Sequence, residues 1–341
     1  MTIGQKASVS LLISVVLFAG FAILAYSGLF EAVQTRFYNP RVASGVNKAL
    51  ETVARESETY HSVLSGRFKS ILALDFVRRS VLPNQSSEDI FNRSSAFGRL
   101  AEETPGLLGV RLVDTDGRRI HFSTYEGDVL TREEFRQVYR NYGDGDPPLD
   151  VLGVPDGSPG AVRILESLNS FIFVFPFRDS FDAYRGTALF QVARSGLQEY
   201  LVKVGALPVG EDFLLLDGRG LLFGAPRQGR AELVRKVAEL WSGRLDSEPI
   251  PVGSTESSEE LVLFSFRGDD RLYGRLAPAS WFILPNSMRI VFLGAFVVTA
   301  YLLSFLLLNL RQDDLAVISH RVKRLQIGLL EIGRASCRER V

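Results

Sequence analysis

The chain has 341 residues, 46% of them hydrophobic and 23% charged, which is the composition of a folded protein. Its 39 basic and 39 acidic residues cancel, so the charge balance does not point to nucleic acid as a partner. The single cysteine, Cys337, leaves everything before it without a disulfide, so packing alone is expected to hold that part together.

Two long uncharged stretches predict transmembrane helices at residues 7–30 and 287–310. The first has no charge between Lys6 and Glu31, and the second has none between Arg289 and Arg311. Each stretch is long enough to cross a hydrocarbon core of about 30 Å as a helix. The small residues around Tyr26 leave a cleaved signal peptide open for the first stretch, although its apolar run is longer than a usual signal core.

The charges that follow the second stretch predict the orientation. Arg311, Arg321, Lys323 and Arg324 place that end in the cytoplasm, because cytoplasmic flanks are rich in basic residues. Two spans then put residues 1–6 in the cytoplasm as well. We therefore expect a two-pass protein of the inner membrane, with both termini cytoplasmic and one large periplasmic loop between the spans.

The carboxyl-terminal part predicts a cytoplasmic linker helix at residues 311–331. Its apolar residues recur at spacings of three and four, as in a coupling helix or a two-helix coil: Leu315, Ile318, Val322, Leu325 and Leu329. The tail at 332–341 breaks this pattern and resembles a translated sequencing-adapter remnant. We expect it to be non-native, with a cytoplasmic output missing beyond about Glu331; a real, disordered basic tail is the alternative.

Residues 31–82 predict a long helix that follows the first span. From Val42 to Ile71 the apolar residues recur at a mean spacing close to 3.6, which predicts one apolar stripe along a spine helix at 40–82. Pro83-Asn84 is expected to end it, and Ser86 or Ser87 to cap the next helix. Such a stripe predicts a homodimer through the spine, unless the chain's own modules cover it.

The region after the spine repeats one plan. "VRLVDTDGRRI" (110–120) and "FLLLDGRGLLF" (213–223) each place an Asp-to-Gly turn between two apolar runs, so each predicts a hairpin. A second hairpin closes each copy, at 170–193 and 261–284. A helical or irregular insert is expected between the two hairpins, at 131–140 in one copy and 231–241 in the other. The predicted fold class is α+β, with two antiparallel-sheet modules at 83–193 and 194–286.

This order of elements resembles the double-Cache (dCache) extracytoplasmic sensor domain of bacterial transmembrane receptors. The segments "ARSGLQEYLVKVG" (193–205) and "SWFILPNSMRIVFL" (280–293) also stand where that family has its connecting helix and its closing strand. The resemblance implies PAS-like modules, the first of them membrane-distal, and a small molecule bound in that first module. The linker lacks the proline expected early in a HAMP module.

Two acidic stretches are candidates for metal sites. Asp114-Thr115-Asp116-Gly117 offers two carboxylates, and the second copy has Arg219 where Asp116 stands, so a tight turn explains both copies and a metal only one. The loop at 141–150 carries Asp144, Asp146 and Asp150 among Gly and Pro, as solvated loops do. We predict no metal, no cofactor and no catalytic residue, since no nucleophile, phosphate-loop, dinucleotide or zinc-protease motif occurs. A lost output domain could still be an enzyme.

The resemblance places a ligand between the first sheet and the insert at 125–143. Arg136, Tyr139 and Tyr142 are three residues apart, so on a helix they would share one face and suit a small anion or an amino acid. Phe173, Phe175 and Asp179 would form the opposite wall. An amphipathic surface helix with core aromatics is the alternative, and the Arg-x-aromatic signature of the amino-acid-binding subset fails at Val138.

We therefore predict an inner-membrane receptor that senses a small molecule and signals through its second span. The rival is an envelope interaction or scaffold protein whose external domain docks a protein or lipid partner. A buried polar site in the first module would favour the sensor, whereas a wholly apolar core there and an exposed apolar patch elsewhere would favour the rival.

Overall fold

The structure, a computed structural model, describes residues 3–82, 85–133, 136–143, 145–152, 156–165, 169–217, 222–223, 239, 249–252, 260–268 and 271–338. The chain divides into two compact units. One, the helical unit, combines residues 1–42 with 280–341, and the other, the sheet unit, is 43–279. Each unit is described by itself.

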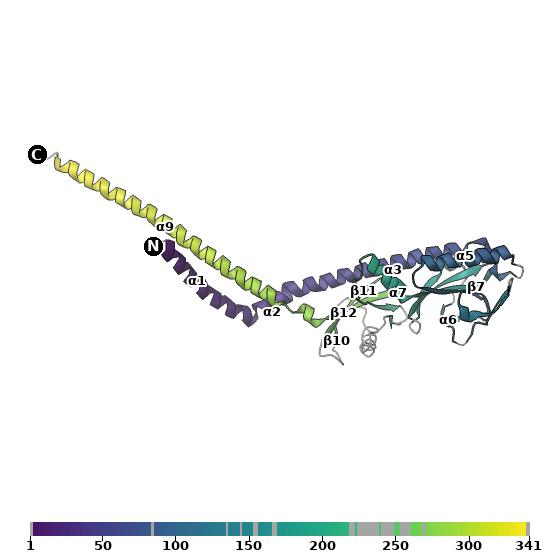
Figure 1. Ribbon diagram of the computed structural model, residues 1–341. Coiled ribbons are helices and arrows are strands. Elements are labelled where there is room, and N and C mark those ends of the chain that lie inside the picture. The colour runs from purple at the N-terminus through teal and green to yellow at the C-terminus, as the bar shows by residue number, and fades with distance from the viewer. Residues whose placement is uncertain are drawn as a thin grey trace. The chain divides into compact units, whose positions relative to one another are not determined.

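Two helices dominate the helical unit (Figure 1). The first, α1 (Ile3–Leu24), passes through a π-helical turn (Ala25–Leu29) into α2 (Phe30–Val33) and a second π-helical turn (Gln34–Tyr38), and Gly28 takes a φ of 146° inside the first of these turns. The second is α9 (Asn286–Arg338). Both helical stretches, Ala7–Leu72 and Ala279–Leu308, are long enough to cross a membrane, and each contains a window of high hydropathy. The backbone of α9 is helical as far as Arg338.

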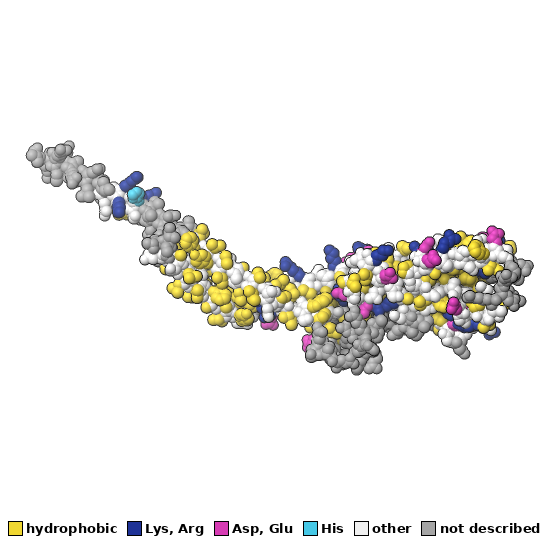
Figure 2. Space-filling view, in the orientation of Figure 1, with side chains coloured by type: hydrophobic (Ala, Val, Ile, Leu, Met, Phe, Trp, Pro, Cys, Tyr) yellow, Lys and Arg dark blue, Asp and Glu magenta, His cyan; other side chains and the backbone are white. Residues whose placement is uncertain are grey.

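The two membrane-type helices pack side by side along their length. The Phe21 and Phe296 rings stack with their centroids 3.9 Å apart, and the Ser10 and Ser304 hydroxyl oxygens lie 2.7 Å apart and share a hydrogen bond. Elsewhere α1 and the first part of α9 expose apolar side chains, and Figure 2 shows these side chains on that part of the helical unit. An apolar outer surface with a small polar contact between helices is the pattern of membrane-spanning helices.

The spine helix is α3 (Asn39–Leu72), which ends ten residues before the predicted Leu82. Leu74 takes an extended backbone (φ −67°, ψ 132°), and the short helix α4 (Asp75–Arg78) and a 3₁₀ turn (Arg79–Val81) follow it. Asp75 lies in the first turn of α4, where a carboxylate favours a new helix start. Pro83-Asn84, the predicted end, lies outside the described residues.

The apolar stripe of α3 is buried inside this one chain. Seven of its members are at most 7% exposed: Val46, Leu50, Val53, Tyr60, Leu64, Phe68 and Ile71. Phe68, for example, stacks on Phe190 of the first sheet with ring centroids 4.3 Å apart. The chain's own modules therefore cover the stripe, so the argument for a homodimer through an exposed spine stripe no longer holds. Helix α5 (Ser87–Glu103) follows, with the Ser86 hydroxyl oxygen accepting the Asp89 N–H as its cap.

The first sheet has five antiparallel strands in the order β2-β1-β7-β6-β5. They are β1 (Leu107–Asp114), β2 (Ile120–Ser123), β5 (Ala161–Leu165), β6 (Ser170–Arg178) and β7 (Tyr184–Ala193). The predicted hairpin at 107–124 is confirmed as β1 and β2. In its turn, the Asp114 carboxylate accepts the N–H groups of Arg118 and Arg119, and Gly117 has a φ of 67°. Asp114 therefore stabilises the turn, as predicted.

The insert differs from the prediction. Residues 126–139 form a 3₁₀ turn (Glu126–Asp128) and a two-stranded hairpin of β3 (Val129–Glu133) and β4 (Arg136–Tyr139), not a helix. One further backbone hydrogen bond extends the hairpin, in which the Arg140 N–H donates to the carbonyl oxygen of Asp128 at 2.8 Å. The single turn α6 (Leu149–Leu152) follows.

Helix α7 (Arg194–Lys203) connects the first sheet to the second, at the place the double-Cache resemblance gave it. The second sheet contains β8 (Leu214–Asp217), β9 (Leu222–Phe223), β10 (Ile250–Val252), β11 (Leu261–Arg267) and β12 (Arg271–Pro278). A 3₁₀ turn (Ala279–Phe282) follows β12. The turn at 218–221 and, apart from Glu239, the insert at 231–241 lie outside the described residues.

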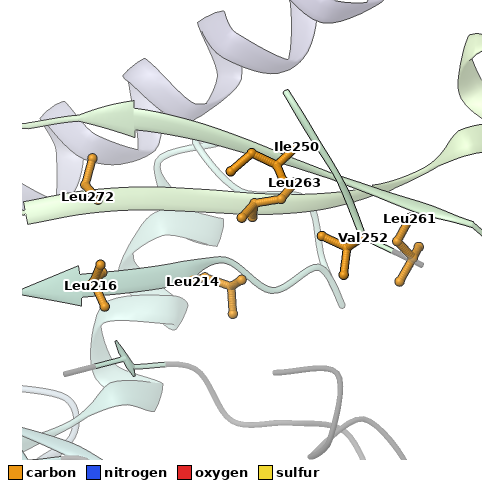
Figure 3. Packing of buried hydrophobic residues seen from close by; sticks show 7 residues of the cluster. All are labelled: Leu214, Leu216, Ile250, Val252, Leu261, Leu263 and Leu272. Carbon is orange, nitrogen blue, oxygen red and sulfur yellow. The ribbon is translucent and has the colours of Figure 1, made fainter. Parts of the chain in front are cut away.

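The two sheets have the same topology. The second sheet reads β9-β8-β12-β11-β10, which is the order of the first with each strand replaced by its counterpart. This confirms the predicted α+β class and the repeat of one plan, and it is the arrangement implied by the double-Cache resemblance. In both modules one sheet face meets α3 (Figure 1). The opposite face of the second sheet carries a cluster of buried aliphatic side chains (Figure 3): Leu214, Leu216, Ile250, Val252, Leu261, Leu263 and Leu272.

Candidate functional site

The face of the first sheet that points away from α3 is covered by residues 125–152, and we call it the insert face. One half of it is an apolar cluster of Val113, Ile120, Tyr142, Leu152, Ile172, Val174 and Leu189. The other half is polar. Strand alternation places Arg111 and Gln191 on this face together with Leu189, because side chains two residues apart along a strand share a side.

Two partly buried arginines and two aspartates with buried carboxylates form a group that we call the charged cluster: Arg111, Asp128, Arg140 and Asp146. The Asp128 carboxylate accepts from Arg111 Nε at 2.6 Å, from Arg140 Nε at 2.8 Å and from the Ser123 hydroxyl at 2.6 Å. Asp146 pairs with Arg140 through two hydrogen bonds of 2.7 and 2.6 Å. The side chains of both aspartates are at most 5% exposed.

A chain of polar groups runs from this cluster across the sheet. The Arg111 guanidinium carbon lies over the Tyr125 ring, 4.2 Å from the ring centroid. The Tyr125 hydroxyl donates a hydrogen bond to Gln191 Oε1 at 2.7 Å. Gln191 in turn donates to the Ser170 hydroxyl at 2.9 Å. Gly109 makes room for the ring, since a Cβ at that position would stand 2.5 Å from it.

The cluster holds its charges firmly. Burial acts to raise the pKa of Asp128, but hydrogen bonds from Arg111 and Ser123 and the charges of both arginines outweigh it, so the pKa lies below its usual value. The pKa of Asp146 is lowered in the same way, against burial, chiefly by hydrogen bonds from Arg140 and the Gly143 N–H. Burial raises the pKa of Tyr125 to about 12. At neutral pH the cluster therefore contains two cations and two anions.

The corresponding strand positions of the second sheet carry different side chains. Asp114 pairs with Gly186 in the first sheet, and Asp217 pairs with Arg271 in the second, which aligns the two registers. When the strands are aligned on these pairs, three polar residues of the insert face match leucines of the second sheet. Arg111 matches Leu214, Gln191 matches Leu276 and Ser170 matches Leu261.

This difference indicates a function for the charged cluster beyond stability. Burying ion pairs has a desolvation cost that their mutual attraction often fails to recover, and apolar replacements are frequently as stable or more so. The second sheet forms the same topology with leucines at the corresponding positions. The polar half of the insert face is therefore the candidate binding site.

The predicted residues of the insert do not share a helical face. The Tyr142 ring is buried in the apolar cluster, with its hydroxyl donating to the Pro147 carbonyl oxygen at 2.5 Å. Tyr139 packs against the same cluster and donates to Gln137 Oε1 at 2.6 Å. Arg136 pairs with Glu133 in the β3–β4 ladder, and its side chain lies outside the described part of the structure.

The predicted opposite wall lies elsewhere. Phe173 points to α3, where its ring meets Phe68 with centroids 5.1 Å apart. Phe175 shares that face and lines a separate cleft of about 330 Å³. Asp179 is buried in the β6–β7 turn, where it accepts backbone N–H groups and Arg185 Nε at 2.6 Å. These three residues and the two tyrosines therefore do not line one pocket.

Four residues of this site were not predicted from the sequence, and Asp146 was predicted only as part of a solvated loop. The four are Arg111, Tyr125, Asp128 and Arg140. A signal for Arg111 was present, because it is a charged residue between two buried neighbours on an otherwise apolar strand. Its partners on the insert had no such signal. Among the described residues, no group of three or more His, Cys, Asp and Glu side chains is placed to hold a metal ion.

Comparisons with known proteins give the following relationships. Residues 38–280 match the family described as "TP_0593_N: N-terminal domain". An uncharacterised protein of Treponema pallidum (strain Nichols) is 31% identical over 335 residues, which cover 96% of this chain and 49% of that protein. The chain thus spans about half the length of this relative.

Several solved sensory domains also align with the chain at low identity. The sensory domain of the Campylobacter jejuni chemoreceptor Tlp3 has a TM-score of 0.45 and 14% identity, covering 74% of this chain and 99% of that one. The ligand-binding domain of the Pseudomonas fluorescens chemoreceptor CtaA, solved with L-leucine, has a TM-score of 0.45 and 12% identity over 74% of this chain and all of that one. By its match over residues 38–280, the chain belongs to the TP_0593_N family.

Proposed function

We propose that this chain is the sensory part of a two-span inner-membrane receptor that binds a small molecule on the insert face of its first sheet. The observation that carries the proposal is the charged cluster, whose strand residue Arg111 stands where the second sheet has Leu214. A buried polar site in the first module is what distinguishes a sensor from a protein that only docks partners on its surface.

The cluster suits a ligand that carries a carboxylate, an ammonium group, or both. A ligand carboxylate would replace Asp146 on the Arg140 fork, because guanidinium binds carboxylates through two parallel hydrogen bonds. An ammonium group would then neutralise the aspartate that is released. A small anion or an amino acid is therefore the proposed ligand class, and Tyr125 offers an aromatic surface beside it.

Signalling would use the two elements that lead out of the sheet unit. Helix α3 is preceded in the chain by the first span, and β12 is followed by α9. Separating the ion pairs of the insert face would favour one arrangement of the insert over another, and a ligand can shift that balance only by its preference for one of them. The basic residues after the second span support a periplasmic sheet unit and a cytoplasmic output reached through α9.

A thermal-shift screen of the full chain in lipid nanodiscs tests the proposal, with amino acids, carboxylates, amines, purines and sugars as probes. A ligand at about 100 times its dissociation constant adds about 2.7 kcal/mol of stability and raises the melting temperature. Arg140→Gln should abolish the shift for a hit. Arg185→Gln is the matched control, since it removes a guanidinium from a buried carboxylate in the β6–β7 turn.

A third variant, Arg136→Ala, tests the arginine of the insert that the sequence predicted to bind the ligand. A hit that survives Arg140→Gln would move the site away from the charged cluster and keep the sensor. No shift across the whole panel, with the protein folded, would favour the envelope interaction protein, whose external domain docks a protein or lipid.

A further inference from the structure

The two modules and the spine helix meet at one side chain, that of Arg271. It is the first residue of β12 in the second sheet, and its Nη1 lies 2.7 Å from Nδ1 of His61 in α3. Its Nη2 donates to the carbonyl oxygen of Val162 in β5 of the first sheet at 3.2 Å. One guanidinium thus joins three elements that are far apart in the sequence.

The His61 ring is the buried end of this contact. It is 6% exposed, and aromatic rings surround it, with Phe171 at 4.8 Å, Phe173 at 5.8 Å and Tyr60 at 5.9 Å between centroids. Arginine can only donate, so Nδ1 must accept and the imidazole is neutral. Nε2 has no hydrogen-bond partner among the described residues.

Few groups are placed to offset a positive charge on this ring. Tyr60 and Glu58 are its neighbours on α3, and Arg271 and Tyr273 face it from β12. Burial raises the pKa of both Tyr60 and Tyr273 to about 12, so they stay neutral. The charge of Glu58 helps to raise the pKa of Tyr273, whereas the charge of Arg271 helps to lower the pKa of His61. Burial first, and Arg271 second, hold the pKa of His61 well below its usual value.

We propose that the His61–Arg271 contact is an acid-released latch between the two sheet modules and the spine helix. A proton on Nδ1 removes the acceptor and places two cations within a hydrogen-bond length in a buried site. The Arg271 guanidinium then moves away from the His61 ring, and its hydrogen bond to the Val162 carbonyl oxygen is lost as well. The latch needs no ligand on the insert face, so it stands independently of the proposed function.

Hydrogen exchange of the full chain in nanodiscs tests the latch, compared at about pH 7.5 and about pH 4.5 after correction for the intrinsic exchange rate. In the wild type, acid should reduce protection of β5 and of the start of β12 by at least about tenfold. His61→Asn keeps an acceptor near the Nδ1 position without a titrating ring, so the acid effect should disappear. Arg271→Gln should expose both strands at either pH.

His121→Asn is the matched control, because it removes another partly buried histidine of the sheet unit and should behave like the wild type. If acid reduced the protection from hydrogen exchange equally in the wild type and in His61→Asn, the proposal would be overturned. Unchanged protection of the wild type in acid would overturn it as well. If His61→Asn does not fold, the ¹⁵N shifts of the wild-type His61 ring decide instead. They should show the Nε2–H form at neutral pH, with protonation coinciding with the loss of protection; a ring that stays neutral while protection falls would refute the latch.

Discussion

Arg111 in β1 and Leu214 in β8 occupy the same register position in two sheets of identical strand order, and Arg111 pairs with two buried carboxylates. The two sheets form a comparison inside one chain. Their shared topology shows which residues the fold requires, and their differences show which residues it does not.

Replacing Arg111 by the residue of the second sheet should unbalance the cluster. Arg111→Leu leaves Asp128 and Asp146 with Arg140 as their shared cation, and losing one partner of a buried pair costs about 3 kcal/mol or more. The melting temperature of the full chain should fall clearly. Adding Asp128→Asn should recover part of the loss; a further fall in the double variant would contradict the pairing.

The stability of the sheet unit should decline in acid because of the same aspartates. The pKa values of Asp128 and Asp146 are lower in the folded protein than the usual 3.8, so the unfolded chain binds protons first as pH falls. Their stabilisation is complete above pH 3.8 and is lost below it, through the folded-state pKa. Melting temperature measured against pH should fall less steeply in the double variant Arg111→Leu/Asp128→Asn than in the wild type.

Gly109 should tolerate no side chain. The Cβ of Gly109→Ala would stand 2.5 Å from the Tyr125 ring, so the ring must move and lose its hydrogen bond to Gln191. We expect destabilisation by about 1–3 kcal/mol, read as a lower melting temperature. Gly127→Ala is the control in the same insert, because nothing lies within 4 Å of its added Cβ. Equal effects of the two alanines would show that the ring does not lie against β1.

The polar contact between the membrane-type helices predicts a specific cross-link. The Ser10 and Ser304 hydroxyl oxygens are 2.7 Å apart, so cysteines at both positions should form a disulfide under mild oxidation in membranes. Leu12→Cys with Ser304→Cys is the control, since Leu12 is 66% exposed on the outside of α1. A shifted band on a gel reports the link, and efficient linking of the control pair instead would refute the packing.

The hairpins were predictable because their signals are local. Runs of β-type residues joined by Asp and Gly identified β1 with β2, and the conformation of Gly117 shows why glycine stands in that turn. The repeat of this pattern then predicted the second sheet. The spacing of apolar residues predicted the spine helix. It could not predict where this helix ends, because the backbone becomes extended at Leu74 without a proline or glycine.

The insert and the site were harder for a physical reason. A spacing of three among Arg136, Tyr139 and Tyr142 does not distinguish a helix from an irregular hairpin in so short a segment. The backbone pairing of β3 with β4, which continues to Arg140 and Asp128, is not encoded in that side-chain spacing. Arg111 could be noticed as a charge on an apolar strand, but its partners become visible only once the fold brings the loops together.

Gly186 and Arg271 are counterparts in the two sheets, and the pair records how the copies diverged. A Cβ at Gly186 would stand 2.0 Å from the Val113 carbonyl oxygen, so the first copy excludes every side chain where the second extends a guanidinium toward α3. On the opposite face the roles are exchanged, with arginine in the first copy and leucine in the second. The same scaffold thus occurs twice in the chain, with an arginine on a different side of it each time.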